Sequence, residues 1–388
     1  MTSALGIILV GAVVAASCAL VGSFLLLRRV TLMGDAISHA VLPGIVLAFL
    51  FSGSRAAGPM MLGAAALGLL TVFFVELFHR SGRLKEDASI GVVFPALFSL
   101  GVILITRYAG QVDLDLDCVL YGEIAYAPLD VFRLGGVALG PRALWSNGVI
   151  LLFNALFVTV FYKELKLSTF DSELAAALGF APLLIHYGLM TAVSVTVVGA
   201  FESVGAILVV AMLVVPPATA YLLTDRLAHL LALAMAFGVL SSVGGYGLAR
   251  LFDVGIAGAM AAVTGLLFTL ALLFSPQHGL VARALRHRRL GNRLLGRIAL
   301  LHLSGTEGGI EVAILRERFA WHGRQLRRAL DELAGHGLVT LEGTTARLTA
   351  AGARAAEAAG AAEIGHPLAR PPVGLPKPDS DQASAFGS

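Results

Sequence analysis

The sequence predicts an all-α polytopic membrane protein that carries a small soluble domain at its C-terminus. The chain has 388 residues, of which 57% are hydrophobic and only 14% are charged, and its mean hydropathy is +0.84. This composition is too apolar for a soluble globular protein. Apolar runs of spanning length recur up to about residue 274, and the composition changes after Pro276.

We expect about nine transmembrane helices, because nine apolar runs approach the ~17 to 25 residues that cross a bilayer. The runs at 182–199 and 204–223 are separated only by residues 200–203, so eight helices is the alternative count. The first run lacks the basic flank of a signal peptide and is interpreted as a retained helix. The nine runs cover 5–27, 34–51, 59–78, 89–106, 147–162, 182–199, 204–223, 229–250 and 256–274.

The distribution of Lys and Arg predicts an outward N-terminus and a cytoplasmic C-terminus. With this orientation the inner loops carry more basic residues than the outer loops, as the positive-inside rule requires. The last apolar run is also followed by a dense basic segment without an acidic residue, which is typical of a cytoplasmic flank. Its members are Arg283, Arg286, Arg288, Arg289, Arg293 and Arg297.

The second apolar run contains two ionisable residues, Asp35 and His39. A charged side chain in hydrocarbon costs roughly 2.5 to 3.5 kcal/mol on insertion scales, so this pair needs a partner or a function. Residues four apart lie on one face of a helix. A carboxylate and an imidazole in that arrangement can hold one divalent cation. Pro43 and Gly44 follow in the same run and would let the helix bend as a path opens.

A second polar position, Glu202, lies at the outer end of an apolar run and is either a metal ligand or a solvated headgroup-level residue. Gly205 permits close helix contact. Pro216 and Pro217 are expected to kink or break the helix near its inner end, so these three residues are further gating candidates. The two cysteines, Cys18 and Cys118, are far apart and indicate neither a disulfide framework nor a thiolate metal site.

Two segments that connect predicted spans carry further candidate functional residues. Residues 163–182 predict a cytoplasmic amphipathic helix, capped by Asp171, with Leu174, Ala175 and Leu178 as its apolar face. On these residues alone it simply joins two spans. The outer connection at 107–146 is either a solvated loop or a docking surface. It is not a calcium loop, because the required Gly and closing Glu are missing. Acidic residues gather in its first half, namely Asp113, Asp115, Asp117 and Glu123.

Isolated polar residues near the inner helix ends are given ordinary roles. His186 is expected to be a hydrogen-bonded packing residue, whereas Glu76 and His79 are expected to be solvated.

After the membrane part, a basic linker at 281–293 leads to a predicted winged-helix domain at 294–360. Helical periodicity covers 294–303, 310–319, 325–335 and 351–359, and two strand-like pieces lie between the last two helices. The predicted third helix carries three candidate DNA contacts, although the small basic excess between 293 and 348 is a weak footprint for DNA. Winged helices also bind proteins, and residues 361–388 are expected to be disordered. The three candidates are Arg324, Arg327 and Arg328.

Taken together, several motifs between residues 1 and 280 resemble the permease subunit of zinc-, manganese- and iron-type ABC importers. The resemblance implies a permease that dimerises with a second permease subunit, receives a divalent cation from an extracytoplasmic binding protein and is driven by a separate ATPase. The C-terminal domain resembles metal-dependent repressor domains. The motifs are MGDAISHAVLPG (33–44), EDASIGVVF (86–94), VDLDLDCVLYGEI (112–124), FDSELAAALG (170–179), ESVGAILVVAMLVVPPATA (202–220) and FSPQHG (274–279).

Residue by residue, the resemblance implies that Asp35 and His39 contribute to the metal path. Glu202 is the third candidate ligand, at a position where several relatives carry a different residue. The remaining motif residues are implied to dock the partners. For the binding protein these are Asp113, Asp115, Asp117, Tyr121 and Glu123, and for the ATPase they are Phe170, Asp171, Glu173, Leu174, Ala175 and Gly179.

The sequence also predicts that this chain is not itself the ATPase. It contains no GxxxxGK[ST] phosphate loop, so a partner chain or an ion gradient must supply the energy. We therefore expect a transport subunit without a permanently bound cofactor, whose substrate is Mn, Zn or Fe(II). Two alternatives stay open at this point, namely a membrane-tethered transcriptional regulator and a proton-coupled metal carrier.

Overall fold

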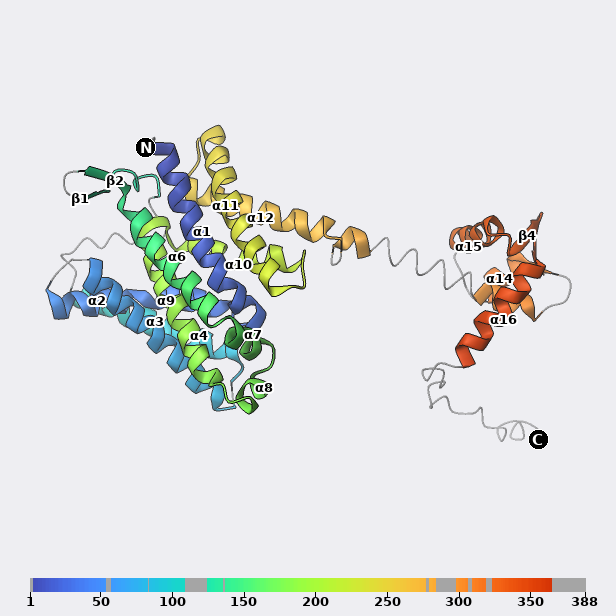
Figure 1. The fold of residues 1–388 in the computed structure, drawn as a ribbon, viewed down its shortest axis with the longest axis horizontal. Coiled ribbons are helices and arrows are strands. Elements are labelled where there is room, and N and C mark those ends of the chain that lie inside the picture. The colour runs from blue at the N-terminus through green and yellow to red at the C-terminus, as the bar shows by residue number, and fades with distance from the viewer. Residues whose placement is uncertain are drawn as a thin grey trace, which may run out of the picture. The chain divides into compact units, whose positions relative to one another are not determined.

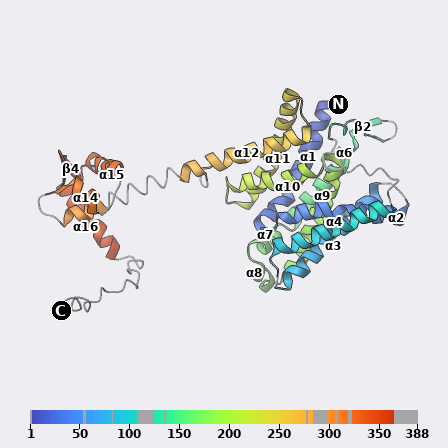
Figure 2. The same cartoon turned by 180° about the vertical axis from the view of Figure 1, so that it is seen from behind.

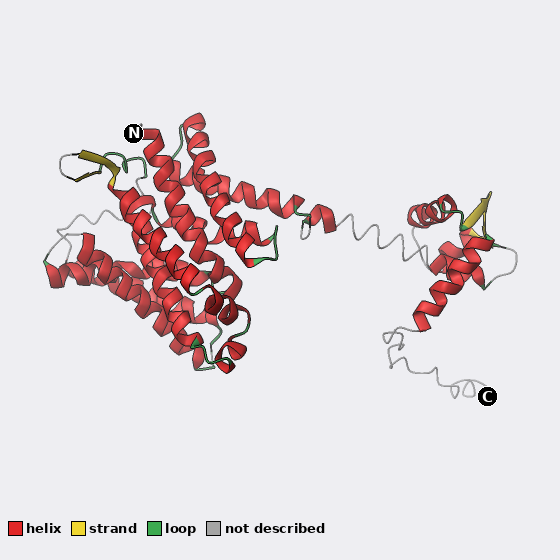
Figure 3. Ribbon diagram, viewed as in Figure 1, coloured by secondary structure: helices red, strands yellow, loops and turns green. Residues whose placement is uncertain are grey.

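The structure is a computed structural model and describes residues 3–53, 57–82, 84–108, 124–134, 137–276, 279–283, 298–305, 309–318 and 323–364. The chain divides into two compact units, Met1–Ala282 and Arg283–Ser388. Figure 3 shows that both units are mainly helical.

All nine predicted spans of the first unit form helices. Eight of the described helices are long and apolar enough to cross a membrane, and a ninth, α10, has 16 residues. The helices are α1 (Ser3–Arg28), α2 (Leu32–Ser52), α3 (Ala57–Arg80), α4 (Glu86–Tyr108), α6 (Arg142–Val160), α9 (Pro182–Val204), α10 (Ala206–Tyr221), α11 (Leu227–Phe252) and α12 (Ile256–Phe274).

The break between α9 and α10 lies at Gly205 and not at residues 200–203 as expected. Gly205 has φ 80° and ψ 162°, a conformation that only glycine adopts without strain. Pro216 and Pro217 are buried inside α10, which continues through both prolines, so the predicted helix break does not occur there.

α10 runs in the same direction as α12. Ser203, just before α10, and Ile256, at the start of α12, both line cavities that include Tyr126. At the opposite end, the Ser275 hydroxyl after α12 donates to the Leu222 carbonyl after α10. The two helices therefore connect the same two ends of the bundle. We call these the Tyr126 end and the Arg28 end, because Arg28 closes α1 at the second one.

The helices pack as two groups that α9 joins. α2 packs most extensively against α3 and α4, whereas α1 packs against α10, α11 and α6, and α12 packs against α10 and α11. The group of α2, α3 and α4 can be followed from both sides in Figures 1 and 2. α9 contacts α1, α2, α3 and α6. α2 also contacts α10 directly, so the two groups meet both at α9 and at the contact between α2 and α10.

Glycines permit the closest helix contacts, as is common in membrane bundles. A Cβ on Gly22 of α1 would overlap the carbonyl oxygen of Leu213 in α10. A Cβ on Gly44 of α2 would lie 2.5 Å from the Gly63 carbonyl oxygen of α3, and one on Gly101 of α4 would lie 2.7 Å from Pro43 Cδ. The predicted hinge at Pro43 and Gly44 is thus enclosed by α3 and α4.

A buried asparagine links three helices away from these contacts. The Asn154 amide of α6 donates to the Ser17 hydroxyl of α1 at 2.9 Å and to the Thr196 hydroxyl of α9 at 2.6 Å. Polar side chains of this kind form stable interhelical contacts in lipid, with an average of about 0.6 kcal/mol per hydrogen bond.

Two features of the first unit differ from the sequence prediction. Between α4 and α6 the chain forms an antiparallel hairpin of β1 (Val131–Leu134) and β2 (Val137–Pro141), so the unit is not purely helical. In the connection at 163–182, the helix expected after Asp171 is the short α8 (Ser172–Ala177), and a second short helix, α7 (Tyr162–Phe170), precedes it. Asp171 has an extended backbone between the two helices.

The second unit combines helices with a small sheet. Residues 298–304 are helical, and a three-stranded antiparallel sheet has the order β3-β5-β4. Buried residues including Leu303, Leu315, Leu326 and Leu330 form its core. The remaining elements are β3 (Ile310–Glu311), α14 (Val312–Arg318), α15 (Gly323–Gly335), β4 (Val339–Glu342), β5 (Thr345–Leu348) and α16 (Ala350–Ile364).

Candidate functional site

The predicted polar pair meets on one face of α2. His39 Nε2 lies 3.5 Å from Asp35 Oδ1, and the two side chains are 31% and 45% exposed, respectively. Asp35 is in the first turn of α2, where the unpaired backbone amides of a helix N-terminus favour a negative charge. The helix geometry thus explains both the contact and the tolerance of a carboxylate at this position.

The environment of the pair is aromatic on one side. The His39 ring lies 5.2 Å from the Phe94 ring and 6.4 Å from the Phe98 ring, both on α4, measured between ring centroids. Ser38, between the pair members, is buried, and its hydroxyl donates to the Gly34 carbonyl within α2. α4 therefore limits the positions of the imidazole, whereas Ser38 interacts only with its own helix.

The spacing of the pair suits two ligands of one ion. Ligand bonds of about 2.1 Å at a tetrahedral angle separate two donor atoms by about 3.4 Å, close to the observed 3.5 Å between His39 Nε2 and Asp35 Oδ1. Among the residues that the structure describes, no group of three or more His, Cys, Asp or Glu side chains could hold a metal ion. One described chain thus offers two protein ligands, which is half of a typical four-ligand set.

Glu202, the third candidate ligand, is not near this pair. It is exposed in the last turn of α9 and lines a cavity of about 280 Å³ at the Tyr126 end, together with Asp130, Arg142 and Ser203. It lies sixteen positions after His186, which is near the Arg28 end, and this offset corresponds to about 24 Å along α9. The structure does not bring Glu202 together with Asp35 and His39.

The α7–α8 segment presents apolar side chains on its surface. Asp171 caps α8 as predicted, because its carboxylate accepts a hydrogen bond of 2.9 Å from the Leu174 amide. Of the predicted apolar face, Ala175 is buried whereas Leu174 and Leu178 are exposed, and the preceding Phe170 is 63% exposed. Glu173 is also exposed, and Gly179 ends the segment with φ 85°.

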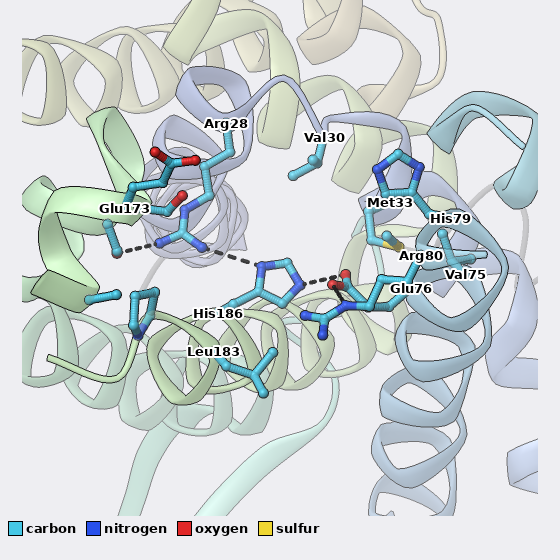
Figure 4. Close-up of a pocket in the computed structure, with 14 residues that line it drawn as sticks. Arg28, Val30, Met33, Val75, Glu76, His79, Arg80, Glu173, Leu183 and His186 are labelled. Atoms are coloured by element: carbon cyan, nitrogen blue, oxygen red, sulfur yellow. Dashed lines mark hydrogen bonds and ion pairs between the residues drawn. The ribbon is translucent and has the colours of Figure 1, made fainter. Parts of the chain in front are cut away.

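Sequence reasoning missed a polar cluster at the Arg28 end. Arg28 of α1, His186 of α9, and Glu76 and Arg80 of α3 line one cavity of about 690 Å³ (Figure 4). Glu76, expected to be solvated, instead contacts Arg80 at 2.7 Å and His186 at 3.4 Å. Glu76 and Arg80 are four residues apart on one helix, and this spacing could have predicted their ion pair from the sequence. No sequence pattern predicts that residues 28, 76 and 186 lie close together, because they are on three different helices.

Two further sets of predicted site residues are the contacts to a binding protein and the contacts to DNA. The proposed binding-protein contacts Asp113, Asp115, Asp117, Tyr121 and Glu123 lie outside the described residues. In the second unit, Arg327 and Arg328 are exposed on α15, followed on the same helix by the exposed acids Asp331 and Glu332. Arg324 belongs to the first turn of α15.

The fold defines a polytopic membrane protein that carries a carboxylate and an imidazole side by side on a partly exposed face of α2. The chain belongs to the ABC 3 transport family, whose model matches residues 3–275.

Curated relatives support this assignment. The chain is 50% identical over 280 residues to the manganese transport system membrane protein MntD of Bacillus subtilis, covering 72% of this chain and 95% of MntD. It is 45% identical over 358 residues to the zinc transport system membrane protein TroD of Treponema pallidum, covering 91% of this chain and 97% of TroD. The match to TroD therefore extends into the second unit.

A solved structure supports the fold of the first unit. A chain of PsaBC from Streptococcus pneumoniae, determined in complex with Fab, aligns with a TM-score of 0.60 and 30% sequence identity. The alignment covers 72% of this chain and 94% of that chain.

Proposed function

We propose that this chain is the permease subunit of an ABC importer that moves a divalent metal cation into the cytoplasm. The observation that carries the proposal is the pair of Asp35 and His39, whose oxygen and nitrogen donors lie 3.5 Å apart on an accessible face of α2. A mixed set of carboxylate and imidazole ligands suits Zn, Mn and Fe(II). The membership of the family and the names of the relatives MntD and TroD agree with a metal as the substrate.

A second copy of the permease subunit would complete the ligand set. If α2 of each subunit faces a twofold axis, two carboxylates and two imidazoles surround one ion. The imidazoles must be neutral to bind a metal, so occupancy would fall at acid pH. Pro43 and Gly44, enclosed by α3 and α4, would transmit a movement of those helices to the pair. Gly205, Pro216 and Pro217 would act as further gating positions along α9 and α10.

The energy would come from a separate ATPase subunit that docks on α7 and α8 at the cytoplasmic side. Support comes from the exposed apolar side chains Phe170, Leu174 and Leu178, since exposed apolar patches mark interaction surfaces. The residues 113–123 would receive an extracytoplasmic metal-binding protein at the other side, where the cavity that contains Glu202 opens.

The test is metal uptake by the purified permease and its co-purified ATPase in proteoliposomes. We expect uptake of Mn²⁺, Zn²⁺ or Fe²⁺ that requires ATP and the binding protein, and competition between these ions would rank them. Uptake that follows an imposed proton gradient and needs no ATP would instead identify a proton-coupled carrier and contradict the proposal.

We also infer that the second unit is a winged helix. Support comes from the element order of helix, strand, two helices, hairpin and helix, and from the sheet order β3-β5-β4. A helix with exposed arginines, here α15, is where a winged helix contacts DNA. The exposed acids Asp331 and Glu332 follow Arg327 and Arg328 by one helical turn. The resulting mixture of charges on α15 favours a protein partner over DNA.

Deleting residues 284–388 tests the role of this unit. Because the family match ends at residue 275, we expect the truncated permease to retain ATP-driven uptake while a metal-dependent response of gene expression or of a partner protein changes. Loss of uptake with normal membrane insertion would show that the unit is instead required for the permease itself. Binding of the full chain to DNA fragments would contradict the preference for a protein partner.

A further inference from the structure

A chain of polar contacts links the α7–α8 segment to α3 at the Arg28 end. The Arg28 guanidinium donates through Nη2 to the Ser168 hydroxyl at 2.9 Å and through Nε to the Thr169 hydroxyl at 3.1 Å, both in α7. Its Nη1 lies 3.3 Å from His186 Nδ1. His186 Nε2 lies 3.4 Å from Glu76 Oε2, and Glu76 Oε1 accepts from Arg80 Nε at 2.7 Å (Figure 4).

The hydrogen bond between Arg28 and His186 has only one possible direction. A guanidinium has only donors, so the Nδ1 atom that faces Arg28 must accept. On the other side of the ring, His186 Nε2 faces the Glu76 carboxylate at 3.4 Å without forming a hydrogen bond. The His186 ring thus lies between a guanidinium and a carboxylate and contacts both.

The contacts between these groups are neither fully buried nor tightly closed. The His186 and Glu76 side chains are 19% and 20% exposed, and the cluster borders the 690 Å³ cavity that Glu173 of α8 also lines. The 3.4 Å contact between His186 and Glu76 is longer than an ordinary hydrogen bond. The cluster therefore has space to tighten or open without disturbing a packed core.

The contact chain joins elements that are otherwise in different helix groups. α7 and α1 are on one side of it, and α3 is on the other, with α9 between them. α3 packs extensively on α2, which carries Asp35 and His39. A displacement of α7 that pulls Arg28 would therefore act on α3, and through α3 on the helix of the metal-ligand pair.

We propose that Arg28, His186 and Glu76 are positioning residues that couple movement of the α7–α8 segment to the group of α2, α3 and α4. This inference rests on the proposed function, in which the ATPase docks on that segment. The three residues do not touch the transported ion. They transmit the displacement that changes access to it.

The decisive pair of variants is His186→Leu and His186→Gln, tested in the complete complex with its ATPase. Leucine removes both contacts of the ring, whereas the amide of glutamine can accept from Arg28 and donate to Glu76. For His186→Leu we expect the number of Mn²⁺ ions transported per ATP hydrolysed to fall by about 2- to 30-fold, the range of coupling effects of such networks. Mn²⁺ binding to the resting complex should be unchanged, and His186→Gln should restore most of the ratio.

His79→Leu is the matched control. His79 lines the same cavity from α3 and is exposed. Because it is not part of the contact chain, its replacement should leave the ratio of transport to ATP hydrolysis unchanged.

Several outcomes would overturn the inference. These are a wild-type ratio in His186→Leu, an equal loss in the leucine and glutamine variants, and an equal loss in His79→Leu. If His186→Leu does not insert, the double variant Ser168→Ala and Thr169→Val removes the two hydroxyl partners of Arg28 and should lower the ratio in the same direction. An unchanged ratio there would also overturn it. Failure of the proposed function is distinguishable, because the wild-type complex would then show no ATP-driven uptake.

Discussion

Asp35→Ala and His39→Ala should each reduce ATP-driven metal uptake by at least about 10- to 100-fold. Loss of a supporting residue near a metal site already costs that much in affinity, and these two side chains are proposed as direct ligands. With donor atoms 3.5 Å apart, removal of either one leaves the other as a lone polar group on α2. Initial uptake rates of Mn²⁺ or Zn²⁺ in proteoliposomes provide the measurement.

Ser38→Ala is the matched control for this prediction. Ser38 lies on the same helix between the two residues and is buried, and its hydroxyl donates to the Gly34 carbonyl of α2 itself. Its replacement should change uptake less than about twofold, because no interhelical contact or proposed ligand is lost. Wild-type uptake by both alanine variants, with normal membrane insertion, would show that the metal path does not use this pair.

Asp35→Asn separates the charge from the shape of the side chain. The amide has nearly the volume of the carboxylate but no negative charge, and a hard divalent cation prefers the carboxylate. Uptake by Asp35→Asn should therefore be nearly as low as by Asp35→Ala. Full activity of the asparagine variant would mean that Asp35 supports the helix and does not bind the ion.

The largest expected effect on stability is that of Gly22→Ala. A methyl group at Gly22 of α1 would overlap the backbone carbonyl oxygen of Leu213 in α10, and a backbone atom cannot move aside as a flexible side chain can. The helices must separate to admit it, which costs about 1 to 3 kcal/mol. We expect a lower midpoint of thermal unfolding in detergent, by several degrees, together with reduced yield in the membrane.

Gly247→Ala is the control for Gly22→Ala. Gly247 is in the interior of α11, is exposed, and has no heavy atom within 4 Å of its would-be Cβ. Alanine favours a helix by about 0.5 to 1 kcal/mol relative to glycine, so this variant should unfold at the same or a higher temperature. An equal decrease in both variants would indicate a general intolerance of substitution and not a close contact between α1 and α10.

Much of the fold of the first unit could be predicted from the sequence, because its helices depend on local patterns. An apolar run of spanning length must satisfy its backbone hydrogen bonds internally, and therefore forms a helix in lipid. The same locality explains why Asp35 and His39 meet, since residues four apart on a helix are neighbours. The cap at Asp171 likewise depends only on the next three residues.

The tertiary structure alone decided the contacts between distant segments. The side chains of Arg28, Glu76 and His186 come from three helices, and their approach depends on how α1, α3 and α9 pack, which no local periodicity encodes. The same holds for Glu202, whose separation from Asp35 follows from the direction of α9. Leu174 and Leu178 have the spacing of a packed helix face but are exposed, and helical spacing alone does not show whether another helix covers such a face.

By itself, the sequence determined the positions of the membrane helices and the pairing of a carboxylate with an imidazole on α2, because hydropathy and helical spacing act over a few residues. Only the tertiary structure decided which polar groups of different helices face one another. It brought Arg28, His186 and Glu76 into successive contact between α7 and α3. The physical reason is that helix packing, and not the order of residues in the chain, determines which side chains share a cavity.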